Sequence, residues 1–142
     1  MFRIFPLLLI SVIAYNLLAL GYGLAGHDVM EHFLSRPFVT FHMFSTDIWD
    51  FSLGDLLLLV SFGLMFVEII KATRTTRREL LNHGLSAAVF VAALIEFITM
   101  KGFSTSVFFF ILVMIAIDVV GGYTISIVAA EHDLGMGKAG TD

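Results

Sequence analysis

The stretch LGDLLLLVSFGLMFVEIIKAT, residues 53–73, followed by RTTRREL, residues 74–80, decides the fold. The first part is an apolar run of the length that crosses the roughly 30 Å hydrocarbon core of a bilayer as a helix. Glu68 and Lys71 lie inside this run, three residues apart, and Arg74, Arg77 and Arg78 follow it. The stretch predicts a membrane helix with a strongly basic end.

The composition of the whole chain agrees with a membrane protein. Of its 142 residues, 58% are hydrophobic and 14% are charged, and the mean hydropathy is +0.96. A soluble domain is nearer half apolar and a quarter charged. The net charge of −4 argues against a nucleic-acid partner. The absence of cysteine excludes disulfides, thiolate metal sites and a cysteine nucleophile.

Four apolar runs predict an all-α, polytopic membrane protein with four transmembrane helices in a single membrane domain, residues 1–142. The expected helices cover about 4–25, 53–73, 83–101 and 106–130. The first run also resembles a signal peptide, with Arg3 before it and small residues after it. Because the run is long for a cleaved signal, we expect it to remain as a membrane helix.

The distribution of basic residues predicts the orientation. Arg3, Lys71, the three arginines after it and Lys138 fall on one side of the predicted bundle, and only Arg36 and Lys101 fall on the other. Because Lys and Arg favour cytoplasmic loops, both termini are expected in the cytoplasm and residues 26–52 in the periplasm. Lys71 is expected to snorkel toward the headgroups, and the arginines to contact anionic phospholipid.

Three segments carry a resemblance to a known family: FVEIIKATRT in the second run, NHGLS before the third, and DVVGGYT in the fourth. They resemble a family of uncharacterised proteobacterial inner-membrane proteins with four predicted helices. The resemblance covers the second to fourth runs. It implies a bacterial inner-membrane location and carries over no activity or functional residue.

Polar residues inside the runs need partners, because ionisable groups at membrane depth cost a few kcal/mol each. They are Asn16, Glu68, Glu96 and Asp118. Asp55, near the start of its run, is expected to act in N-capping. Two interpretations of the four remain open: hydrogen bonds that hold helices together, or steps of a proton or cation path.

Small residues repeat at four-residue intervals beside two of these carboxylates, which places each carboxylate on a packing face. The short link GFST, residues 102–105, predicts an antiparallel hairpin of the last two helices. Glu96 and Asp118 should then lie at different depths, and Asn16, Glu68 and Asp118 could meet in the inner half. Glu68 either pairs with Lys71 or turns inward. The expected helix-packing residues are Gly84, Ala88, Ala92, Gly121, Gly122 and Ser126.

Residues 26–52 are too polar to cross and are expected to lie at the membrane surface. His27, Glu31 and His32 have the spacing of a zinc or copper site, although ordinary side-chain pairs on an amphipathic helix explain the same pattern. Aromatic residues after Pro37 at three- and four-residue steps predict a second interfacial helix. No histidine is expected at membrane depth, since His83 should begin a helix in the cytoplasm. The tail, residues 131–142, is expected to be loosely ordered.

Function follows less directly from these features. No catalytic constellation is evident and no cofactor is predicted. We expect a small non-enzymatic membrane protein that forms a homo-oligomer or serves as an accessory subunit of a larger complex. The alternative is an oligomeric proton or cation channel or transporter that uses the intramembrane carboxylates. A third possibility is a metal-binding protein at the periplasmic face.

Overall fold

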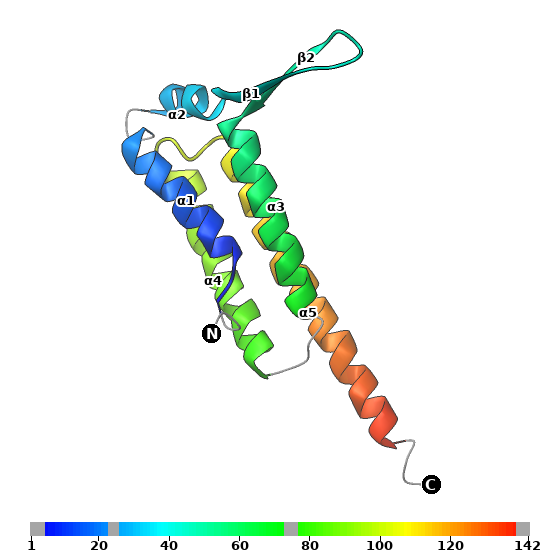
Figure 1. The fold of residues 1–142 in the computed structure, drawn as a ribbon. Coiled ribbons are helices and arrows are strands. Elements are labelled where there is room, and N and C mark those ends of the chain that lie inside the picture. Colours follow the sequence, from blue (N-terminus) through cyan, green and yellow to red (C-terminus); the bar gives the residue numbers. More distant parts are fainter. Residues whose placement is uncertain (1–4, 23–25, 73–76, 139–142) are drawn as a thin grey trace.

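Three long helices lie side by side and form most of the molecule (Figure 1). The computed structural model describes residues 5–22, 26–72 and 77–138. The three helices are α3 (Leu53–Ala72), α4 (Arg77–Thr99) and α5 (Ser106–Lys138). Short connections make consecutive helices antiparallel, as the GFST link predicts. The hairpin of the last two helices is therefore present.

Three helices are long and apolar enough to cross a membrane: α3, the Leu81–Thr99 part of α4 and the Ser106–Ile125 part of α5. The helix α1 (Leu8–Gly21) has only 14 residues. At about 1.5 Å per residue it is about 21 Å long, well short of a roughly 30 Å hydrocarbon core. The prediction of a helical membrane protein is thus supported, whereas the count of four crossings is not confirmed.

The outward faces of these helices are apolar, as a lipid environment requires. Leu17, Ile98 and Val120 are each about two-thirds exposed. Side chains of this size rarely gather on the surface of a protein dissolved in water. The helices therefore expose the surface that the composition predicts, and they bury polar groups between them instead.

The helix α1 packs on the α4–α5 end of the bundle through Tyr15. This side chain is fully buried and its ring contacts Phe103 and Phe108. Its hydroxyl donates to the Gly102 carbonyl oxygen at 2.8 Å and lies 2.6 Å from the Thr105 hydroxyl. The connection between α4 and α5 is therefore held by a residue far away in the sequence.

The start of α3 is fixed by a reciprocal cap, so the prediction for Asp55 is confirmed. Its carboxylate accepts from the Ser52 amide at 2.9 Å, and the Ser52 hydroxyl accepts from the Asp55 amide at 3.1 Å. The pair occupies the first and fourth positions of a capping box. It marks the boundary between the membrane helix and the segment before it.

Half of the outer segment differs from the prediction. The amphipathic helix α2 (His27–Leu34) is present, but the prediction of a second interfacial helix was wrong. Strands β1 (Pro37–His42) and β2 (Ile48–Ser52) form an antiparallel hairpin in its place. Cross-strand pairs Val39–Phe51 and Phe41–Trp49 give one apolar face, while Thr40–Asp50 lies on the other. Side chains in this segment thus alternate between two faces, as in a β-strand, and do not form one face of a helix.

The helices α4 and α5 are longer than their apolar runs. The first begins at Arg77 instead of about 83, and the second continues to Lys138 and extends past the other helices (Figure 1). The tail expected to be loose is therefore helical up to Lys138. The earlier start of α4 places His83 in its second turn, inside the candidate span Leu81–Thr99, where the side chain is fully buried. The expectation that His83 begins this helix was therefore wrong.

Candidate polar site between α3, α4 and α5

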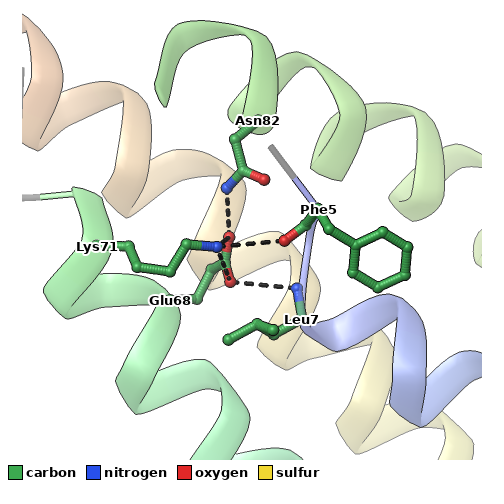
Figure 2. A network of polar contacts seen from close by, with 5 residues as sticks. All are labelled: Phe5, Leu7, Glu68, Lys71 and Asn82. Carbon is green, nitrogen blue, oxygen red and sulfur yellow. Dashed lines mark hydrogen bonds and ion pairs between the residues drawn. The ribbon is translucent and has the colours of Figure 1, made fainter. Parts of the chain in front are cut away.

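Glu68 is the centre of a polar network near the end of α3 (Figure 2). Its side chain is fully buried. One carboxylate oxygen accepts a hydrogen bond from the Leu7 backbone amide at 3.2 Å, and the other accepts from the Asn82 side-chain amide. The carboxylate thus joins three segments: the residues before α1, the end of α3 and the start of α4.

Lys71 neutralises this buried carboxylate. Its ammonium lies 3.1 Å from both Glu68 carboxylate oxygens and donates to the Phe5 carbonyl oxygen at 3.2 Å. The side chain is only 20% exposed. The ammonium therefore points into the network and not outward to headgroups, which corrects the snorkelling expectation. Of the two alternatives for Glu68, the pair with Lys71 is the one formed.

The first turns of α4 supply polar groups that the sequence pattern did not reveal. Asn82, His83 and Ser86 are all buried. The His83 ring lies so close to α5 that a Cβ on Gly122 would overlap its Cε1 and Nδ1 atoms. Asn82 and Ser86 are four residues apart and lie on the same face of α4. This buried face continues along the helix with Val89 and Ala93. That spacing was readable, but the predicted helix start at 83 excluded Asn82.

Asp118 completes the site from α5. The side chain is 1% exposed, and neither carboxylate oxygen has a hydrogen-bond partner of ordinary geometry within the described residues. The polar groups that influence the charge of its carboxyl are the Ser86 hydroxyl, followed by Glu68, His83 and Lys71. Asp118 and Glu68 are thus parts of one polar cluster, as the sequence allowed. We call these six side chains the inner cluster: Glu68, Lys71, Asn82, His83, Ser86 and Asp118.

Asn16 does not belong to the inner cluster, in contrast to the expectation. Its side-chain amide donates to the Glu96 carboxylate at 3.0 Å and to the Val12 carbonyl oxygen at 3.0 Å. Both Asn16 and Glu96 are partly exposed and line a groove of about 460 Å³ between α1 and α4. The four predicted polar residues therefore divide between two places in the molecule.

The two predicted small-residue faces have different positions. Gly84, Ala88 and Ala92 are all exposed. Ala88 and Ala92 line the groove beside α1, whereas a Cβ on Gly84 would lie 3.8 Å from the Tyr123 hydroxyl of α5. Gly122 is buried against His83, whereas a Cβ on Gly121 would meet nothing within 4 Å. The Ser126 side chain lies outside the described part. The α5 face is thus internal, and the α4 face borders the groove beside α1.

The predicted outer cluster is a surface pair. His27 and Glu31 are joined at 2.9 Å, and both side chains are substantially exposed. His32 is exposed as well. Within residues 5–22, 26–72 and 77–138, no group of three histidine or acidic side chains converges in a way that could hold a metal ion. A zinc or copper ion here would rest on two protein donors.

The basic residues that predict the orientation lie mostly beyond what the structure describes. Arg74 falls outside the described residues. Arg77 and Arg78 form the first turn of α4, and their side chains are likewise not described. Their proposed contact with anionic phospholipid stays a prediction from the sequence.

Buried carboxyl, imidazole, hydroxyl and amide groups in one place are able to hold and exchange protons. Comparison with known proteins adds nothing to this chemistry. No family model, curated protein or solved structure matches the chain. The family resemblance drawn from the sequence therefore stays a prediction, and the geometry of the chain is the only guide to its function.

Proposed function

We propose that this chain is a non-enzymatic bacterial inner-membrane protein that assembles with a second copy of itself across the α1–α4 groove. The single observation carrying the proposal is the small-residue face of α4. Gly84, Ala88 and Ala92 are left exposed in a helix otherwise buried on its opposite side. Close approach of helices in membranes uses such faces, because small side chains let backbones come together.

The shape of the groove favours a second copy as the occupant. Ile13 and Leu17 of α1 protrude beside it, and they are 47% and 65% exposed. In a two-fold interface the same patch meets itself, so the α1 ridge of each copy would enter the α4 groove of the other. The Asn16–Glu96 pair would then be covered, which suits a polar pair on a membrane helix. An accessory subunit of a larger complex would use the same face with a different partner.

Ala92→Leu tests this assembly. The larger side chain fills the groove, so the variant should be monomeric under conditions in which the unchanged protein is a dimer or larger oligomer. The control is Gly63→Leu on α3, because a Cβ there meets nothing within 4 Å. The mass of the purified protein in lipid nanodiscs is the measurement. A monomeric unchanged protein, or an oligomer that tolerates Ala92→Leu, would contradict the proposal.

A second candidate function is proton or cation translocation, favoured by the unpaired carboxyl of Asp118 in the inner cluster. The path from this cluster toward Glu96 passes the apolar side chains Val89 and Ala93, which offer no relay. Steady flux of protons or cations would require water to enter between these apolar side chains. Flux into liposomes that is abolished by Asp118→Asn, with the oligomeric state retained, would select this function over assembly alone.

A further inference from the structure

Unpartnered polar atoms in this protein are concentrated at one point. In the described part of the chain, every buried side-chain nitrogen or oxygen without a hydrogen bond belongs to Asn82, His83, Ser86 or Asp118. Such atoms are few in native proteins, because a buried polar group without a hydrogen bond destabilises the folded state. Their grouping marks the part of the bundle where α4 and α5 leave polar atoms without a protein partner.

The charges of the inner cluster do not balance without one further positive charge. Glu68 and Lys71 neutralise each other at 3.1 Å. Asp118 then contributes a negative charge that no further fixed cation balances among the side chains that the structure describes on α3, α4 and α1: α4 presents His83 and Ser86, and α1 (Leu8–Gly21) contains no charged residue. Tyr123, whose ring centroid lies 5.7 Å from that of His83, supplies a hydroxyl and no positive charge. One positive charge is needed, because an isolated buried carboxylate is very costly.

A proton fits this place better than a metal ion. The His83 ring occupies the surface of Gly122, and no three histidine or acidic side chains of the described chain converge on a metal position. A proton needs no coordination space. A carboxyl, a hydroxyl and an imidazole together provide both donors and acceptors for it.

The site opens in one direction. Toward the end of α3, the chain of polar groups continues through Glu68 to Lys71, which is 20% exposed. In the opposite direction the buried residues of α4 and α5 are apolar, among them Val89, Ala93, Ile111 and Ile115. The next buried polar side chain of α3 is Ser61, seven residues from Glu68, and its hydroxyl donates to Ser11 and to the Leu57 carbonyl oxygen instead. A proton therefore reaches the site from the Lys71 end and leaves by the same way.

We propose that Asp118, together with the unpartnered Ser86 hydroxyl and His83 imidazole, forms a buried proton-binding site reached only from the Lys71 end of the bundle. Such a site deepens the second candidate function but requires proton binding alone, whether or not protons cross the membrane. Because His83 lies against Gly122, loading and release of the proton act directly on the α4–α5 contact.

Infrared difference spectroscopy of the full chain in lipid tests this site. The unchanged protein should show the C=O stretch of one protonated carboxylic acid, which disappears in a single step as the pH is raised. Asp118→Asn should lack this band while keeping the helical circular dichroism spectrum. Asp55→Asn is the control, because that carboxylate caps α3 outside the cluster and its loss should leave the band unchanged.

Ser86→Ala keeps the test decisive if Asp118→Asn does not fold. Loss of the hydroxyl should shift the frequency of the band without removing it, since the surroundings of the carboxyl become less polar. Absence of the band at every pH at which the protein stays helical would overturn the proposal. Loss of the band on addition of Na⁺ at constant pH would also overturn it, in favour of a cation site. Proton flux into liposomes is measured separately, so that absence of flux with the band present refutes transport and leaves the site standing.

Discussion

Gly122 shows how one residue sets the distance between two helices. The GG pair at 121–122 predicts close packing or a kink, and the structure separates its two members. Only Gly122 faces α4, where the His83 ring lies against its Cα. The absence of a side chain at this position is therefore what allows an imidazole to be buried beside Asp118.

Gly122→Ala is expected to destabilise the protein. The new Cβ would lie within 3.0 Å of three atoms of the His83 ring, and a buried ring cannot move aside without displacing its neighbours. Overpacking of this kind costs about 1–3 kcal/mol. Thermal unfolding in detergent micelles, followed by circular dichroism, is the measurement.

Gly121→Ala is the matched control for that experiment. A Cβ at Gly121 meets nothing within 4 Å, so the change should be neutral or stabilising by up to about 1 kcal/mol through helix propensity. Equal unfolding temperatures for the two variants would refute the close contact between His83 and Gly122.

Part of the inner cluster could be predicted from the sequence, and the rest was missed for an identifiable reason. Glu68 and Lys71 are three apart on one helix, a spacing from which a pair is readable. Asn82 was missed because the helix start was placed where apolar residues begin. Residues 77–80, RREL, are helical but carry three charges, so an apolar-run criterion excludes them. The contacts of Asn16 depend on how α1 is rotated about its own axis. The periodicity of apolar residues in the sequence does not give that rotation.

At the scale of elements, the hairpin shows the limit of interpreting aromatic spacing. Residues 38–51 fit both a helical stripe and an alternating strand pattern, because aromatics are frequent at several spacings. The turn between the strands decided the outcome: Thr46 has a φ of 72°, and the Ser45 hydroxyl donates to the Asp47 carboxylate at 2.8 Å. A compact turn flanked by β-branched and aromatic residues is typical of a hairpin.

The docking of α1 depends on the Tyr15 hydroxyl, and Tyr15→Phe should weaken it. Removal of the hydroxyl leaves the Gly102 carbonyl oxygen and the Thr105 hydroxyl buried without this partner, a loss of about 1–3 kcal/mol. Tyr22→Phe is the control, because Tyr22 is 44% exposed and stacks on Phe33. The free energy of unfolding in mixed micelles should fall for Tyr15→Phe alone. An equal fall in both variants would contradict the role of the buried hydroxyl.

At the scale of the whole molecule, the two ends of the bundle have different character. The helix α2, the hairpin and the α4–α5 connection lie at one end (Figure 1). The residues before α1 reach Lys71 near the opposite end, and α5 extends past it. The cluster of basic residues, from Lys71 to Arg78, belongs to this second end by its position in the chain. The orientation predicted from the basic residues places the Lys71 end of the inner cluster on the cytoplasmic side.

Cysteine labelling tests this orientation without background, since the chain has no cysteine. Ser45→Cys lies at the exposed hairpin turn and Lys138→Cys at the end of α5. Three candidate membrane crossings separate the two positions. Because three is an odd number, the two cysteines must lie on opposite sides of the membrane, whether or not α1 also crosses it. In cells with a permeable outer membrane, an impermeant maleimide should label Ser45→Cys, and Lys138→Cys only after the inner membrane is opened.

The same labelling decides the role of α1. A cysteine added before Met1 should behave like Lys138→Cys if α1, although only 14 residues long, completes a fourth crossing with the segment before it. A label reaching the added cysteine from the Ser45 side would instead place α1 within one leaflet. The Glu68–Leu7 hydrogen bond favours the first outcome, because it fixes the residues before α1 at the far end of a helix long enough to span the bilayer.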